Sequence, residues 1–304
     1  MSKSSTAAVN QALTSFASGV AQDTKSALAD FIAPRVPVGV TDGHFKKFDD
    51  KNTFRTYNTK RGMGGAATRI HMDAEDPTFS CEANALEAAV DDIERKKAGE
   101  FQQALEEAKI REVIVSANLA HEIDVCAAAH ALSGTSKVWG ANADPIDDID
   151  QAILDIATRT GMMPNRMVMS IGTWKLLKNH KNVISRQRST TDKAVDLGGF
   201  ASMLLNPSIE IKLGILSKDT AKEGKAASKQ NILGGDVLVF CASQNPTTFD
   251  PSFMKTFSVG DVSTGNVTEY RDERCSSDIY KVAWYEDVKV VSALCAERLA
   301  VSAS

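Results

Sequence analysis

The longest helical pattern in the chain lies between residues 82 and 132. Its apolar residues fall on one stripe, with a change of phase in the second half: Leu86, Val90, Ile93, Phe101, Leu105, Ala108, Val113, Leu119, Ile123 and Cys126. Because a spacing of three and four residues is the period of one helix face, we predict a long helical segment. The range exceeds the usual length of a globular helix, so we expect a break at Gly99 or near residues 116–118.

The first 33 residues carry only a thin apolar face on a polar strip. The apolar residues fall at helical spacing in two short stripes: Val9, Leu13, Phe16 and Val20, then Ala27, Leu28, Phe31 and Ile32. Because so narrow a face cannot stabilise a helix on its own, we expect this segment to lie against another surface. Pro34 and Pro37 then force extended backbone.

Residues 39–80 show no helical period. Glycines punctuate a run of aromatic and charged residues that contains Phe54 and Tyr57. This pattern predicts a long two-stranded excursion with a glycine-rich tip at residues 61–65. Loops of this size usually carry function or contact a partner.

Residues 140–260 have the pattern of mixed helix and strand. Asp144 and Pro145 are the residue types of an N-cap and a first helical position, and Gly161 ends the apolar stripe that follows. We further predict strands at residues 167–170, 209–213 and 236–241, a helix at 171–179, a polar Lys-rich loop at 217–231, and a β-rich tail with strands near 268–271 and 279–285 joined by a turn at 275–277.

Composition narrows the classes of protein that the chain can belong to. It has 304 residues, a net charge of −4 and a pI near 5.8, which argue against a surface that grips nucleic acid everywhere but allow local basic patches. Its five cysteines are scattered and form no CxxC pair, so we expect buried free thiols in a reducing cytosol. No run approaches the roughly 20 apolar residues of a membrane helix, and residues 1–11 lack a signal-peptide core.

No pattern of catalytic or metal-binding residues emerges. His121 and Glu122 begin a zinc-peptidase motif, but Val125 stands where the second imidazole would be. The acidic run at residues 144–150 opens a helix, so N-capping explains it better than a cation loop does. The glycines near residue 64 lack the context of a nucleotide loop. We therefore expect a protein that is not an enzyme and that has no cofactor and no metal.

The order of these parts resembles the major capsid proteins of tailed bacteriophages, which share the Hong Kong 97 fold. The most specific stretch runs from Trp139 to His180: an Asp-Pro helix start, the turn Gly161-Met162-Met163-Pro164-Asn165, a buried strand and a helix with Trp174. Residues 32–38 look like the exit of the N-terminal arm of that family. Residues 54–61 look like its extended loop. The resemblance spans about residues 30–300.

The resemblance implies an α+β capsid fold in successive segments. These are an N-terminal arm at residues 1–38, an extended β-loop at 39–81, a peripheral domain with a long spine helix at 82–139, an α/β axial domain at 140–253, and a return to the peripheral domain at 254–304. Arm and loop would contact neighbouring subunits, and the contact candidates are Phe16, Phe31, Phe54, Tyr57, Lys60, Arg61 and Gly64.

The implied function is self-assembly into the icosahedral head of a tailed bacteriophage that encloses double-stranded DNA. The implied partners are further copies in hexamers and pentamers, a scaffolding protein, a portal and decoration proteins, with non-specific contact to the packaged DNA and no membrane. The location would be the virion, assembled in the host cytoplasm. Two other interpretations stay open: an encapsulin-like bacterial compartment shell that encloses cargo enzymes, and an α/β enzyme with its site within residues 140–250.

Overall fold

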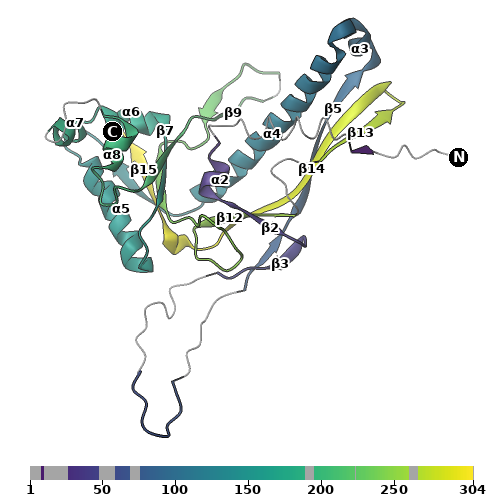
Figure 1. Cartoon of the computed structure of the whole chain (residues 1–304). Coiled ribbons are helices and arrows are strands. Elements are labelled where there is room, and N and C mark those ends of the chain that lie inside the picture. Colours follow the sequence, from purple (N-terminus) through teal and green to yellow (C-terminus); the bar gives the residue numbers. More distant parts are fainter. Residues whose placement is uncertain are drawn as a thin grey trace.

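The computed structural model describes residues 8–9, 27–47, 59–68, 76–188, 195–222, 224–259 and 266–303. Two mixed β-sheets are joined by one long helix, which runs alongside strands of the first sheet, and residues 59–68 project away from both sheets (Figure 1). In the part of the chain that is described, no helix is both long and apolar enough to cross a membrane.

The first sheet is built around one long strand. Its strands are ordered β1 (Ala8–Val9), β13 (Asn266–Asp272), β14 (Ser277–Val290), β12 (Met254–Val259) and β2 (Arg35–Val38), with β5 (Glu82–Asp91) also pairing with β14. The hairpin of β13 and β14 turns at residues 273–276, which confirms the predicted turn and both predicted tail strands. Residues 35–38 are extended and run parallel to β12, as the prolines predict.

Two sequence predictions are wrong in this sheet. Residues 82–91 form strand β5 instead of the start of a helix, since all ten pair antiparallel with residues 277–286 of β14. Backbone pairing along the whole segment outweighs its alanine-rich, helix-favouring composition. Val9, which was predicted to lie on a helix, lies in a strand opposite Thr268. The other residues of that predicted stripe, Leu13, Phe16 and Val20, lie outside the described residues.

The spine of the fold is α4 (Gln102–His130), preceded by α3 (Asp92–Ala98) and a short 3-10 turn, η1 (Gly99–Phe101). The break predicted at Gly99 is confirmed: its φ of 55° lies in the left-handed region that glycine favours. No break occurs near residues 116–118, and α4 continues for 29 residues, roughly 43 Å. The first half of α4 packs on the first sheet, and the second half packs into the main hydrophobic core, which contains strands of the second sheet.

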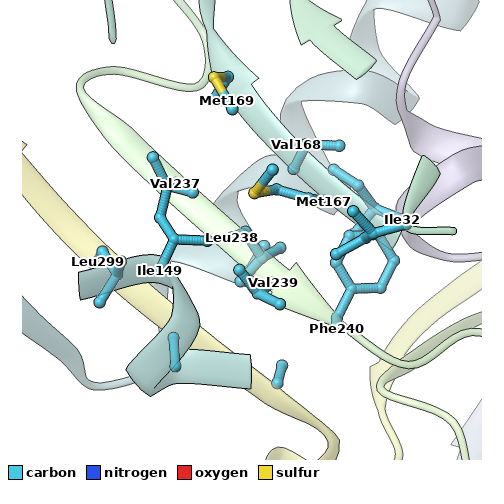
Figure 2. Packing of buried hydrophobic residues seen from close by; sticks show 14 of the residues in the cluster. Ile32, Ile149, Met167, Val168, Met169, Val237, Leu238, Val239, Phe240 and Leu299 are labelled. Atoms are coloured by element: carbon cyan, nitrogen blue, oxygen red, sulfur yellow. The ribbon is translucent and has the colours of Figure 1, made fainter. Parts of the chain in front are cut away.

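The central strands of the second sheet lie inside the main hydrophobic core. Its order is β6 (Gly134–Val138), β15 (Ala296–Ser302), β11 (Asp236–Phe240), β7 (Arg166–Ser170) and β8 (Glu210–Gly214). Around it pack α5 (Pro145–Thr160), α6 (Ile171–Lys178), α7 (Lys181–Arg188) and α8 (Leu197–Ala201). Figure 2 shows β7 and β11 side by side in this core, with Ile149 of α5 and Leu299 of β15 packed near them.

Local signals placed most of these elements correctly. Asp144 caps α5 by accepting a hydrogen bond from the Asp147 amide, Pro145 is the first helical residue, and Gly161 ends the helix with a φ of 67°. The predicted strands at 167–170, 209–213 and 236–241 and the helix at 171–179 are all present. The predicted polar loop at 217–231 is wrong at both ends, because β9 (Ser217–Asp219) and β10 (Lys229–Asn231) pair as a short hairpin.

The five-stranded sheet draws on three parts of the chain. Strands β6 and β15 come from outside residues 140–253, the range that the sequence assigned to an axial domain. Three connections therefore cross between the two sheets: α4 leads into β6, the segment after β11 leads to β12, and η2 (Ala293–Cys295) joins β14 to β15.

Candidate assembly surfaces

The base of the projecting loop is a small aromatic core. Strands β3 (Asp42–His44) and β4 (Thr78–Ser80) pair antiparallel, which confirms the two-stranded start of the predicted excursion. Phe79 stacks on Phe257 of β12 with ring centroids 4.5 Å apart, and Phe45 packs on the same ring at 5.3 Å. Gly43 lies beneath Phe79, where an added Cβ would stand 2.6 Å from the ring. The loop therefore leaves the sheet from a fixed, closely packed root.

Polar contacts reinforce this root. The Ser80 hydroxyl donates to Asp42 at 2.6 Å, and the Ser80 amide donates to Asp287 of β14 at 2.8 Å. Lys46 and Asp76, on the two sides of the loop, form an ion pair at 2.5 Å. Because these bonds join both branches of the loop to each other and to β14, they set the direction in which the loop departs.

The described tip of the loop is exposed. Every residue from 59 to 68 is exposed except the half-buried Gly65, and the side chain of Met63 is fully exposed. Gly64 has a φ of 79°, the Gly65 amide donates to the Gly62 carbonyl, and the Arg61 guanidinium donates to the Gly65 carbonyl. The contact candidates Lys60, Arg61 and Gly64 thus lie together on this tip, while Phe54 and Tyr57 lie outside the described residues.

The structure places the arm candidates differently. Phe16 lies outside the described residues, and Phe31 belongs to the main core of its own subunit. Its ring meets Phe240 edge-on at 5.9 Å and carries the cations of Arg166 and Lys212 on its faces, at 4.7 Å and 4.4 Å. With only 6% of Phe31 exposed, the stripe at residues 28–33 serves folding of the subunit and leaves little surface for a neighbour.

A buried carboxylate of the spine helix holds the segment where the arm enters the fold. Glu122 accepts a hydrogen bond from the amide of Ala29 at 2.7 Å, at the start of the short helix α2 (Ala29–Ile32). A negative charge at a helix N-terminus satisfies amides that have no partner within the helix. Burial raises the pKa of Glu122, and the hydrogen bonds from Ala29 and Leu28 oppose that rise.

A second buried carboxylate joins three elements. Glu286 of β14 lies 3.2 Å from Arg35 of β2 and 3.3 Å from the His121 ring of α4, and it accepts a hydrogen bond from Trp284 at 2.9 Å. Burial alone would raise the pKa of Glu286, but the His121 contact, the Trp284 hydrogen bond and the Arg35 charge together lower it to about 2. His121 and Glu122, which lie within the predicted long helical segment, are both buried on α4.

A fully buried lysine binds the loop that follows β11. Lys255 of β12 has no exposed side-chain area, and its ammonium group binds the Asp250 carboxylate at 2.9 Å and the carbonyls of Thr247 and Asp250. The same loop touches the root of the projecting loop, because the Lys46 amide donates to the Thr248 carbonyl at 3.2 Å. Phe249, between these anchors, is 65% exposed.

Other residues that could suggest chemistry have structural partners. In the acidic run, Asp144 binds Arg186, Asp148 binds Lys137 and Trp139, and Asp150 accepts from the Leu205 amide, so the run serves packing around α5. Within the described ranges, no group of three or more His, Cys, Asp or Glu side chains is placed to hold a metal ion.

Two exposed apolar positions were missed from the sequence. Phe101, in the turn between α3 and α4, is 75% exposed, and Ile93 of α3 is 63% exposed. The predicted stripe counted both as buried helix positions. Gly99 ends α3 and interrupts the continuous helix on which the predicted stripe depended, and it is the one local signal that could have indicated this.

Comparison with known sequences gives one curated relative. The major capsid protein of Burkholderia phage BcepMu is 29% identical over 171 residues, which cover 52% of this chain and 55% of the relative. The match thus spans about half the length of that protein. No protein-family model matches the sequence.

Solved structures match over nearly the whole chain. A phage-related protein from Bordetella bronchiseptica RB50 is 23% identical, with a TM-score of 0.74, covering 96% of this chain and 97% of that one. The capsid of Cyanophage P-SCSP1u matches with a TM-score of 0.56 at 10% identity, covering 90% and 87%. The SrpI encapsulin of Synechococcus elongatus PCC 7942 matches with a TM-score of 0.52 at 11% identity, covering 92% of both chains. These likenesses confirm the α+β capsid fold of the Hong Kong 97 type and the resemblance seen in the sequence.

The root of the projecting loop gives a stability prediction. Phe79→Ala removes a buried ring from the stack on Phe257 and should lower the free energy of unfolding by about 3 kcal/mol. The matched control is Phe249→Ala, which truncates an exposed ring and should change it by less than about 0.5 kcal/mol. Urea unfolding followed by tryptophan fluorescence measures both, and equal effects would show that Phe79 is not a packing residue.

The lowered pKa of Glu286 gives a pH prediction. Its ordinary value is 4.5 and its value in the folded chain is about 2, so the stabilisation is complete above pH 4.5 and is lost as pH falls from 4.5 towards 2. The loss should reach about 3 kcal/mol. Glu286→Gln should flatten this part of the pH–stability curve, whereas Glu112→Gln, at an exposed site on α4, should keep it. An unchanged acid limb in Glu286→Gln would contradict the assignment.

Proposed function

We propose that this chain, which has the Hong Kong 97-type capsid fold, is a major capsid protein that self-assembles into the icosahedral head of a tailed bacteriophage around double-stranded DNA. The observation that carries the proposal is the match in fold over 96% of the chain to a phage-related protein, together with the sequence likeness to a phage major capsid protein.

The projecting loop gives physical support. Its root is packed and hydrogen bonded, yet its described tip is exposed and contains a turn in which Arg61 donates to the Gly65 carbonyl. Ordering an exposed loop costs conformational entropy that contacts with a neighbour can offset. Many modest contacts, repeated around closed symmetry, then sum to a stable shell. Lys60, Arg61 and Gly64 are our proposed contact residues on this tip.

The proposal includes the segments that the resemblance to the capsid family implies. Residues 1–38 form the arm, 39–81 the extended loop, 82–139 and 254–304 the peripheral domain, and 140–253 the axial domain. Since residues 28–33 are core residues of the subunit, the portion of the arm that contacts neighbours would end before Leu28. In this proposal the second sheet would be shared by the two domains, since β6 and β15 lie in the segments assigned to the peripheral domain.

The proposed role is structural and not enzymatic, and its place is the virion after assembly in the host cytoplasm. The partners are other copies in hexamers and pentamers, a scaffolding protein, a portal and decoration proteins. The acidic pI near 5.8 suits a wall that encloses DNA through non-specific contacts.

Electron microscopy of the purified full chain tests the proposal directly. Negative-stain images should show shells, or rings of five and six subunits, and size-exclusion chromatography should show species far above 33 kDa. A monodisperse monomer with no particles, also in the presence of a co-expressed scaffolding protein, would contradict the proposal and favour the α/β enzyme.

The fold match to an encapsulin keeps a second shell function in view. The contents of native particles separate the two functions. Nuclease-resistant double-stranded DNA inside supports the phage head, whereas a cargo enzyme without DNA would support a compartment shell.

The loop tip gives a prediction for assembly. Arg61→Glu reverses a charge whose described contact is within the tip, so it should reduce the yield of shells at least tenfold while leaving the Tm of the subunit unchanged. Lys222→Glu makes the same reversal beside the β9–β10 hairpin and serves as the control. Sedimentation measures shell yield, and wild-type assembly of Arg61→Glu would remove the tip from the contact set.

A further inference from the structure

Two of the five cysteines occupy the connections between the sheets. Cys241 directly follows β11, where the chain leaves the second sheet towards β12. Cys295 ends η2, where the chain enters the second sheet from β14. These are two of the three crossings between the sheets, and both thiols are buried, with 6% and 2% exposed.

The backbone holds the two residues face to face. Strands β11 and β15 pair antiparallel as far as Phe240 opposite Ala296. Continuing that register by one residue brings Cys241 opposite Cys295. The Cys241 amide donates to the Cys295 carbonyl at 2.8 Å. Opposite residues that exchange both backbone bonds have Cα atoms about 5.5 Å apart, within the span of about 4.4–6.8 Å that a disulfide bridges. One of these two bonds is made here, because the Cys295 amide donates to the Ser292 carbonyl instead.

The surroundings polarise this pair. The hydrogen bond with Cys241 lowers the pKa of Cys295 to about 7 against the opposing effect of burial, with help from Ser292 and the Arg159 charge. The same hydrogen bond and burial raise the pKa of Cys241. One thiol is therefore the better nucleophile and the other its adjacent partner, which is the arrangement of a reactive dithiol.

The remaining cysteines have no such arrangement. Burial raises the pKa of Cys81 to about 11 and that of Cys126 to about 12, which makes both poor nucleophiles. The Cys81 thiol donates to the Phe257 carbonyl at 3.5 Å, and Cys126 lies within α4. Cys275 is exposed at the β13–β14 turn.

We propose that Cys241 and Cys295 form an intramolecular disulfide when the protein meets an oxidising medium, and that this bond joins two of the three connections between the sheets. The proposal goes beyond shell formation, and it holds for the subunit whatever the subunit assembles into.

The oxidant is a small disulfide such as oxidised glutathione. The Cys295 thiolate attacks one of its sulfurs, forms a mixed disulfide and releases the other half as a thiolate. The Cys241 thiol gives up its proton and attacks the Cys295 sulfur, which expels the second half. Two protein thiols are oxidised and one small disulfide is reduced to two thiols. Since both sulfurs are buried, exchange requires local opening and should take minutes to hours.

Peptide mapping of the full-length protein tests the bond. The chain is incubated with oxidised glutathione, its free thiols are alkylated in denaturant, and it is digested with trypsin without reduction. Cleavage gives peptides 230–255 and 290–298, each with a single cysteine. We expect these two peptides joined, 2 Da lighter than the sum of their free-thiol masses, and separated again by dithiothreitol.

Variants and stability provide the controls. Cys275→Ser should leave the linked peptide intact, while Cys241→Ser or Cys295→Ser should abolish it. The oxidised protein should melt about 5 °C above the reduced protein, because the bond closes a long loop of the unfolded chain. Should either serine variant fail to fold, the wild-type map still decides the question.

The contrary results are equally definite. Oxidation of the exposed Cys275 shows that the oxidant has acted. If both peptides are then still recovered unlinked and alkylated, the proposal is overturned. So would either cysteine linked to a different partner. If the disulfide forms but the Tm of the oxidised protein does not rise, the proposal that the bond stabilises the connections between the sheets is overturned, and only the formation of the disulfide stands.

Discussion

Strand β14 changes neighbours at Glu286, and most of the architecture depends on that change. β14 pairs with β13 up to Ala283 and with β5 up to Glu286, and from Glu286 onward it pairs with β12. At this point a buried carboxylate meets Arg35 of β2 and His121 of α4. A buried charge left without partners costs several kcal/mol, so these three elements can hold only the relative positions that satisfy it. The arm exit, the spine helix and the sheet are thereby fixed to one another.

The same junction relates folding to assembly. Glu122, one residue along α4 from His121, holds the N-terminus of α2, so the chain enters the fold at a defined place. Phe257 of β12 packs against the root of the projecting loop. The two segments that our proposal assigns to neighbours therefore both start from rigid anchors within one subunit. The exposed tip of the loop can adapt to a neighbour while the root of the loop stays in place.

The sequence predicted those features that short-range chemistry determines. Asp144, Pro145 and Gly161 fix the ends of α5 through capping and backbone preference, and Gly99 ends α3 for the same reason. Buried strands such as β7 and β11 show as short apolar runs. The excursion after residue 39 was predicted from its glycines and lack of period, and the paired strands at its root confirm that part.

Features set by partners distant in sequence could not be predicted in the same way. Residues 82–91 have a helical pattern, and only pairing with a strand almost 200 residues later makes them a strand. Phe31 has the pattern of an amphipathic arm, but its partners Phe240 and Arg166 are unknowable from local sequence. The meeting of Glu286 with His121 likewise follows from the fold and not from any motif.

The loop between Cys241 and Phe253 has a consequence for how such a protein can change over evolutionary time. The Phe253 amide closes the loop at its root by donating to the Cys241 carbonyl at 3.0 Å, and Lys255 holds its far side from within the core. Neither anchor depends on the number of residues near Ser243 and Asn245. Doubling the length of a flexible loop costs only about 0.6 kcal/mol. Insertions can therefore accumulate at this site, up to a small added domain, while both sheets keep their geometry.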